Sequence, residues 1–177
     1  FETTGLSPAQ GDRATEIAAV ILEGGRVVDR YQSLMNAGVR VPAHIEALTG
    51  ISNAMLREAP PAADVMRAVA DFVGDSPLVA HNAAFDMRFL QLKEDSTGVV
   101  FRQPVLDTLL LSGVLHANQD SHQLDHIAER LGVVIAGRHN ALGDACATAE
   151  VFLRMLPLLA QMGIVTLRQA LDASEKS

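Results

Sequence analysis

Three short segments carry acidic and histidine side chains of the kind that can do metal-assisted chemistry. Residues 1–5 read FETTG, residues 81–86 read HNAAFD, and residues 139–144 read HNALGD. Carboxylate oxygens are hard ligands that suit Mg²⁺ or Mn²⁺, and an imidazole titrates close to neutral pH. Brought together, such groups could hold divalent ions and take a proton from an attacking water molecule.

Each segment taken alone also has an ordinary structural explanation. A glutamate inside a strand is costly to bury unless it is paired or binds a cation, but Glu2 could equally lie at a strand end near solvent. Asn82 could cap a helix with Asp86 in its first turn, where the helix dipole alone favours a carboxylate. His139 could be an exposed loop residue. The functional interpretation of the three segments therefore depends mainly on their joint order and spacing.

The spacing within the third segment restricts its geometry. Five residues on one helix turn through about 500°, so His139 and Asp144 would diverge by about 140° if both were helical. They converge only if His139 lies on a loop before the helix, which Gly137 and Asn140 favour. Asp144 stands seven residues before Val151 and is therefore expected on the buried side of that helix.

The elements that must position these segments follow an α/β pattern. Residues 1–3 resemble the end of a strand, residues 15–34 a β-hairpin turning at Gly24-Gly25, and residues 78–80 a short buried strand. A helix starts at Pro60-Pro61 and ends at Gly74, and further helical patterns cover residues 84–93, 107–115, 122–131, 141–159 and 165–173. Strands first, then strands alternating with helices, predict a mixed β-sheet flanked by α-helices.

Composition limits the class of protein. The chain has 177 residues, a formal net charge of −7, 49% hydrophobic residues and a single cysteine. These values exclude a disordered chain and a disulfide scaffold, and no apolar run is long enough to span a membrane. No signal peptide is visible and a lone thiol is compatible with a reducing cytoplasm, so we expect a cytoplasmic protein. The acidic balance argues against a general nucleic-acid coat, although bound metal ions could supply local positive charge.

The order of the three motifs is that of a known family. A glutamate in an opening strand, then HNxxFD, then HxxxxD resembles the DnaQ-like exonucleases of the DEDDh group, which include the proofreading ε subunits of bacterial DNA polymerase III. The resemblance covers roughly residues 1–155 and is closest to ε-like members, through FETTGL, LTGIS, HNAAFD and HNALGDA. It implies a ribonuclease H-like α/β fold, an exonuclease domain over residues 1–160 and a C-terminal helical appendage over residues 161–177.

The resemblance also implies an activity and a set of site residues. It implies a two-metal-ion 3′–5′ exonuclease of proofreading or repair type, which shortens single-stranded DNA and releases nucleoside 5′-monophosphates. The carboxylates of Glu2, Asp86 and Asp144 would hold two Mg²⁺ or Mn²⁺ ions, and His139 would be the general base. The terminal nucleotide would contact Thr3, Thr4, Gly5, Leu6, Thr49, Asn82 and Phe85. Many ε-like proteins have histidine where Thr49 stands.

The family motif begins with an aspartate that this sequence does not contain. Because the family pattern is Asp-x-Glu, we expect an aspartate directly before Phe1, on a strand of which residues 1–3 are the end. If that residue is another type, a non-catalytic nucleic-acid or protein-binding module of the same fold becomes the alternative. An RNA-trimming exoribonuclease is a further alternative. A polymerase subunit is a candidate partner, and the oligomeric state is not indicated.

Three other features are given structural explanations. Asp107 is interpreted as an N-cap rather than a metal ligand, and His122 with His126 as a surface or substrate-rim pair. Helical geometry turns Cys146 about 200° away from Asp144, so we expect a buried structural thiol. The alternative for Cys146 is a thiol hydrolase that uses His139.

Overall fold

The computed structural model describes residues 1–137 and 139–176, with the side chains of residues 92–96 excepted. Three antiparallel strands form one sheet in the order β1 (Glu2–Thr3), β2 (Ala14–Glu23) and β3 (Arg26–Leu34). Two parallel strands, β4 (Leu78–Ala80) and β5 (Val105–Asp107), form the other. The predicted hairpin is confirmed, with Gly24 and Gly25 at φ of 62° and 82° in its turn.

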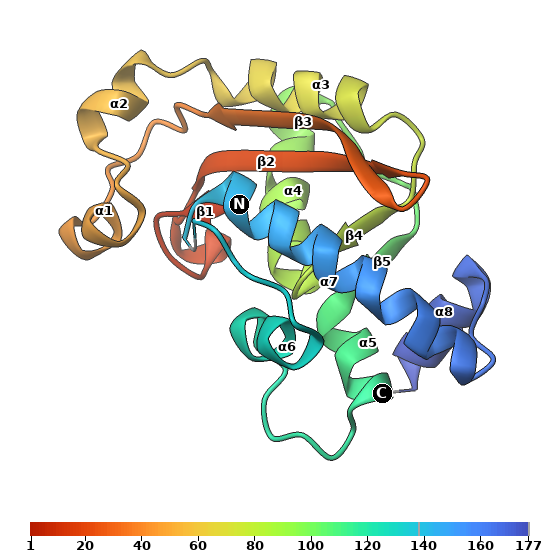
Figure 1. The fold of residues 1–177 in the computed structure, drawn as a ribbon. Coiled ribbons are helices and arrows are strands. Elements are labelled where there is room, and N and C mark those ends of the chain that lie inside the picture. The colour runs from red at the N-terminus through yellow and green to blue at the C-terminus, as the bar shows by residue number, and fades with distance from the viewer. Residues whose placement is uncertain (138, 177) are drawn as a thin grey trace.

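Helices account for most of the remaining chain (Figure 1). Their bounds are α1 Ala43–Thr49, α2 Asn53–Glu58, α3 Ala62–Val73, α4 Ala83–Thr97, α5 Thr108–Leu115, α6 Leu124–Leu131, α7 Ala141–Gln161 and α8 Leu167–Glu175. A 3₁₀ turn, η1, covers Pro8–Gln10. The mixed strand directions and flanking helices agree with the predicted class, and none of the described helices is long and apolar enough to cross a membrane.

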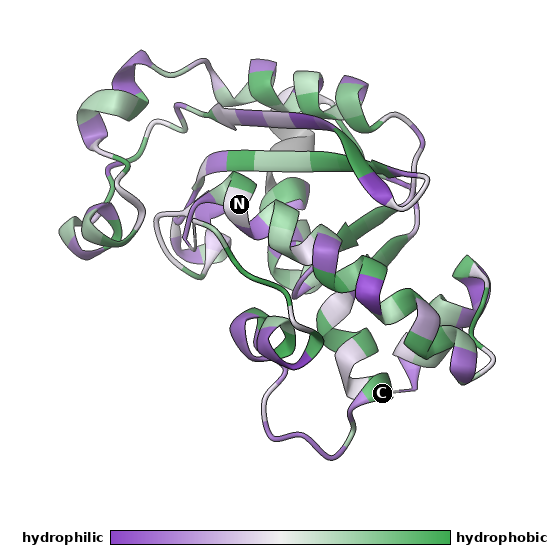
Figure 2. Ribbon diagram, in the orientation of Figure 1, coloured by the Kyte–Doolittle hydropathy of each residue, from purple (hydrophilic) through white to green (hydrophobic). Residues whose placement is uncertain are grey.

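Helices cover both faces of the strands. The long helix α7 packs on β2 and β4, whereas α3 packs on β2 and β3, and α4 packs on β4 and β5 (Figure 1). One core cluster joins β2 to α3 and α4 through residues such as Ile17, Val69 and Phe89. A second joins β5 to α5, α6, α7 and α8, and Ala170 of α8 belongs to it. Hydrophobic residues follow β2, β4 and β5, while β3 is largely hydrophilic (Figure 2).

Several expectations about the elements need correction. Strand β5 was not foreseen, because residue 107 was expected to open a helix. Leu48 and Thr49 end helix α1, which was not among the predicted helices. The strand at residues 78–80 exists, but its side chains are only half-buried, since they face a cavity. Short elements of three to seven residues offer too few positions for periodicity to reveal them.

Candidate active site

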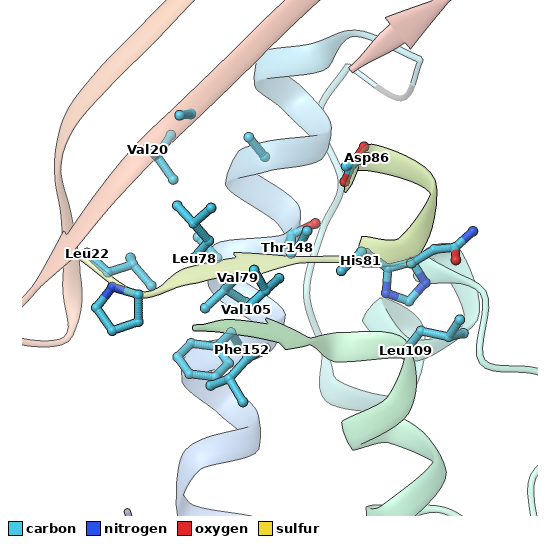
Figure 3. Close-up of a pocket in the computed structure, with 18 of the residues that line it drawn as sticks. Val20, Leu22, Leu78, Val79, His81, Asp86, Val105, Leu109, Thr148 and Phe152 are labelled. Carbon is cyan, nitrogen blue, oxygen red and sulfur yellow. The ribbon is translucent and has the colours of Figure 1, made fainter. Parts of the chain in front are cut away.

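Asp86 and Asp144 face one cavity, although they come from different motifs. The cavity has a volume of about 1410 Å³ and opens between β2, β4, α4 and α7 (Figure 3). Asp86 lies in the first turn of α4 and Asp144 in the first turn of α7. Three further residues of the predicted site, Leu6, Asn82 and Phe85, also line the cavity, as does the first residue of the chain, Phe1.

The turn before α4 is held by the carboxylate of Asp107. Asn82 adopts a left-handed conformation with φ of 59°, which asparagine tolerates better than most other non-glycine residues. The backbone N–H groups of Asn82 and Ala83 donate to Asp107 at 2.9 and 3.0 Å, and that of Leu109 donates at 2.8 Å. Asp107 is 8% exposed. It therefore caps α5, as predicted, and also binds the start of α4.

The electrostatic surroundings of Asp86 favour a cation beside it. Burial raises the pKa of Asp86 from its usual 3.8 to about 6. The nearby charge of Asp107 also raises that pKa. A bound cation stabilises the charged form of a buried carboxylate, so this environment suits a metal ion.

The turn before α7 has a parallel construction. His139 has φ of 64°, Asn140 caps the helix by accepting from the Gly143 N–H at 3.0 Å, and Asp144 follows on the helix. His139 thus lies on the turn and Asp144 on the helix, as their spacing predicted. A second strand carboxylate, Glu16 on β2, accepts from the Ala141 N–H at 2.9 Å.

Space is also tight where this turn meets α7. A side chain at Gly143 would collide with the carbonyl oxygens of Ala136 and Gly137. The helix start can approach the preceding loop this closely only with glycine at that position.

Glu2 is buried on β1, opposite Glu16 in the β1–β2 register. After it, Thr3 donates to the Gly5 carbonyl, and the buried Thr4 hydroxyl bonds to Asp12 and accepts from the Arg13 N–H. These bonds occupy both threonine hydroxyls in shaping the loop.

The rest of this loop leaves one apolar side chain available. A side chain at Gly5 would collide with the Asp12 carboxylate. Leu6 projects from the loop with 79% of its surface exposed. It is the residue of this segment best placed to touch a ligand entering the cavity.

The structure does not bring every predicted residue to the cavity. Thr49 ends α1, and its hydroxyl bonds within that helix end to the Ile45 carbonyl and the Ile51 N–H. The described cavity lining contains neither Thr49, Glu2 nor His139. Among the side chains that the structure describes, those of residues 1–91, 97–137 and 139–176, no three His, Cys, Asp or Glu form a group that could hold a metal ion. The carboxylate chemistry fits a divalent ion, whereas a complete ligand set is not assembled by these residues.

The histidines and the cysteine lie in other environments. His122 precedes α6 and bonds to Ser112 at 2.7 Å, and His126 bonds to Ser121. The expectation of a buried Cys146 is wrong: the thiol is half-buried and lines a separate shallow cavity with Gly132 and Arg154. Since Asp144 lines the other cavity, this geometry gives no support to a thiol hydrolase.

Sequence reasoning missed two acidic residues that position the site. Glu16 stands in an apolar strand, and a buried glutamate there was a signal that its carboxylate must be satisfied. Asp12 accepts from the Ser7 N–H at 3.0 Å and from Thr4, which braces the loop after β1. Asp107 was recognised, but only as the cap of the helix that follows it.

Comparison with known proteins then places the chain among its relatives. A family model described as Exonuclease matches residues 1–152, which include all three motifs. The chain belongs to this exonuclease family. The DEDDh family generally uses divalent metal ions, which agrees with the carboxylates found at the cavity.

Two curated relatives illustrate the sequence similarity. A DNA polymerase III subunit epsilon-like protein of Rhodobacter capsulatus is 45% identical over 179 residues, covering 99% of this chain and 25% of the relative. The PolC-type DNA polymerase III of Bacillus subtilis is 39% identical over 165 residues, covering 92% of this chain and 11% of the relative. The chain thus spans a quarter or less of the length of these relatives.

Solved structures confirm the predicted ribonuclease H-like fold. Exonuclease X in complex with 5′ overhanging duplex DNA superposes with a TM-score of 0.71 at 22% identity, over 98% of this chain and 95% of that one. Escherichia coli exonuclease I with a dA16 oligonucleotide gives 0.76 at 17% identity, over 91% and 40%. The predicted exonuclease family and the predicted fold are therefore confirmed.

Proposed function

We propose that this chain is a metal-dependent 3′–5′ exonuclease domain that shortens single-stranded DNA from its 3′ end. The observation that carries the proposal is that the aspartates of two separate motifs, Asp86 and Asp144, line one cavity. The membership of the chain in the exonuclease family supports the proposal. The names of the relatives, DNA polymerase III subunits, favour DNA over RNA and suggest a proofreading or repair role beside a polymerase.

Glu2, Asp86 and Asp144 would be the metal ligands, together with an aspartate directly before Phe1. Mg²⁺ or Mn²⁺ fits these hard oxygen donors and, when two ions are bound, would acidify water and stabilise charge on the phosphate. Asp86 must lose its proton to serve, and its raised pKa of about 6 permits that at neutral pH. His139, on the turn five residues before Asp144, would accept the proton of the attacking water.

The substrate end of the cavity combines apolar and polar contacts. Leu6 and Phe85 offer surfaces against which a terminal base can pack, and Asn82 offers an amide. Arg88 lies 5.9 Å from the centre of the Phe85 ring, which puts a positive charge beside this surface. Thr3, Thr4, Gly5 and Thr49 act indirectly, since their observed contacts shape the neighbouring loops.

The remaining proposals concern the domain boundaries and the cellular location. Residues 1–160 would form the exonuclease domain and residues 161–177 an appendage, although Ala170 is buried in the same core. A cytoplasmic site beside a replicative polymerase is the setting that fits these proposals.

The test is a degradation assay with a 5′-labelled single-stranded DNA and an RNA of the same sequence. The chain would be prepared with and without an aspartate directly before Phe1, and incubated with Mg²⁺, Mn²⁺ or EDTA. We expect a metal-dependent ladder that shortens from the 3′ end, faster on DNA, and absent in Asp144→Asn. An exposed acid on α3, changed in Asp71→Asn, is the matched control. Absence of degradation with either metal would contradict the proposal and favour a binding module.

A further inference from the structure

Two buried nitrogen atoms between α5 and α6 lack a hydrogen-bond partner within the described part of the chain. One is Nδ1 of His116, the residue that follows α5, and the other is Nη1 of Arg130, in the last turn of α6. Buried polar atoms of folded proteins are paired in the large majority of cases, with protein groups or with a bound species. Two such atoms, on side chains whose charges interact, indicate a common ligand.

Capping of the helices does not account for these two nitrogens. Cations near a helix C-terminus usually bind its last carbonyl groups. Arg130 instead donates from Nη2 to the carbonyl of Ser121, in the loop before α6, and its Nη1 binds none of the described residues. At the end of α5 the backbone N–H of His116, rather than its imidazole, bonds to the Ser112 carbonyl at 2.8 Å. Both side chains are thus held in place while one nitrogen of each remains for another group.

Positive charge gathers around His116. Its neighbour His122 is fixed to α5, because the fully buried Ser112 hydroxyl lies 2.7 Å from His122 Nδ1. Burial lowers the pKa of His116, and the charges of Arg130 and His122 lower it further. Both charged groups in this effect are cationic, so a negatively charged ligand would offset them.

A metal ion and a water molecule suit this place less well than an oxyanion. The Arg130 guanidinium would repel a metal ion, and the described side chains include no group of three His, Cys, Asp or Glu that could hold one. A water molecule could bond to both nitrogens but would leave their charge uncompensated. An oxyanion accepts both hydrogen bonds and offsets the charge, and charge-assisted bonds to arginine are stronger than neutral ones.

We propose that His116, His122 and Arg130 form a binding site for a phosphate group. Gln123, directly after His122, lines the cavity of the candidate active site, so the phosphate site lies beside that cavity. The phosphate is either a phosphodiester of a strand whose 3′ end enters the cavity or a free phosphate ion. The first source rests on the proposed function, and the second does not.

The first measurement is a titration of the 177-residue chain with inorganic phosphate, at constant ionic strength and in the presence of EDTA. The imidazole signals of His116 are followed by nuclear magnetic resonance. We expect a saturable shift of these signals and a rise in the pKa of His116, because a bound anion favours the protonated imidazole. A side chain with a structural role alone would show neither.

Variants test whether the named side chains hold the phosphate. Arg130→Gln removes the guanidinium and should weaken phosphate binding about tenfold or more. Arg67→Gln changes an exposed arginine on α3 and is the matched control, which should bind phosphate as the unchanged chain does. His116→Ala tests the second nitrogen and guards against a folding defect in the Arg130 variant. Phosphate should raise the unfolding temperature of the unchanged chain and the Arg67 variant, but not of the other two.

A short single-stranded DNA distinguishes the two sources of phosphate. If the site binds the strand, the DNA shifts the same His116 signals and competes with phosphate, whereas an uncharged methylphosphonate analogue does neither. If the site binds free phosphate alone, the DNA leaves these signals unchanged.

Two results would overturn the proposal. One is the absence of a saturable His116 shift up to about 20 mM phosphate and with the DNA. The other is equal phosphate binding by the Arg130, His116 and Arg67 variants. The phosphate titration involves no nuclease activity, so its failure and the failure of the proposed function are distinguishable.

Discussion

The helices α4 and α7 begin in similar ways and differ in how firmly their first turns are held. Each follows a residue with positive φ, Asn82 or His139, and each carries a site aspartate in its first turn. Each is also bound by a buried carboxylate from a strand. Asp107 accepts three backbone N–H groups from two helices, whereas Glu16 accepts one N–H of α7 and the side-chain amide of Gln32.

This difference shows that one carboxylate can both position a site residue and change its pKa. Asp107 stands beside Ala80 in the β4–β5 ladder, so it reaches the start of α4 across the sheet and the start of α5 along the chain. Its charge also raises the pKa of Asp86. Glu16 is bonded at the start of α7, where its contact is with the backbone. Changes at Asp107 should therefore affect stability and titration together, and changes at Glu16 mainly stability.

The largest effect is expected for Asp107→Ala. Three backbone N–H groups would lose a charged acceptor in a buried place, which we expect to cost about 3–5 kcal/mol of unfolding free energy. Asp107→Asn is the control, because its remaining oxygen can still accept from Asn82 and Leu109 and only the bond to Ala83 is lost. Urea denaturation measures both variants. A cost below about 1 kcal/mol for Asp107→Ala would contradict the positioning role.

Glu16→Ala should have a smaller effect of about 1.5–3 kcal/mol. It removes the acceptor of one backbone N–H, at Ala141, and of one side-chain amide, at Gln32. Glu16→Gln retains an oxygen for Ala141 and should cost less. The comparison of the two helix starts fails if Glu16→Ala destabilises the chain as much as Asp107→Ala in the same urea titration.

The contacts of Asp107 and Glu16 also show which features the sequence could predict and which it could not. The Gly24-Gly25 turn predicted the hairpin, and the motif HNAAFD after a short apolar run predicted the turn into α4. The contact between Asp107 and α4 depends on the pairing of Ala80 with Asp107. Strand pairing between segments 27 residues apart leaves no local periodicity, so it became visible only in the fold.

The same limit applies to the site as a whole. The spacing of His139 and Asp144 predicted a loop followed by a helix, because helical geometry permits no other convergence. The sequence did not predict which site residues line the cavity. Asp86 and Asp144 line it, whereas Thr49 lies at the end of α1. Such placement depends on how helices pack on the sheet, which short motifs do not encode.

Asp107 and Glu16 should also differ in how they affect the pH dependence of activity. Metal binding needs ionised Asp86, so metal-dependent activity should fall as the pH drops through about 6. Asp107→Asn removes a charge that raises this pKa and should move the acid limb of the profile to lower pH, whereas Glu16→Gln should leave it in place. A pH–rate profile of the three proteins checks this, and identical acid limbs would contradict it.

The raised pKa of Asp86 also makes the free energy of unfolding depend on pH. Between about pH 3.8 and 6 the folded chain binds the Asp86 proton and the unfolded chain does not, so folding is favoured by that proton. This contribution is complete at lower pH and is lost as the pH rises through about 6. In Asp86→Asn the fall of unfolding free energy over this range should be smaller than in the unchanged chain, measured by urea titration.

The smallest effect is expected for Cys146→Ala. Cys146 lines a separate cavity together with Gly132 and Arg154, and it is not among the residues that line the cavity with Asp144. We expect nuclease activity within about twofold of the unchanged chain, since no group at the cavity is altered. Loss of activity in this variant, or its inhibition by iodoacetamide in the unchanged chain, would favour the thiol hydrolase instead.

The most direct test of the account is a Mn²⁺ titration followed by electron paramagnetic resonance. The chain would carry an aspartate directly before Phe1, and Asp86→Asn, Asp144→Asn and the exposed control Asp71→Asn would be compared with it. If the two motifs share a metal site, Mn²⁺ binds the parent and the Asp71 variant equally, and each of the other two variants binds at least about tenfold more weakly. Equal binding by all four proteins, or no binding by the parent, would contradict the account.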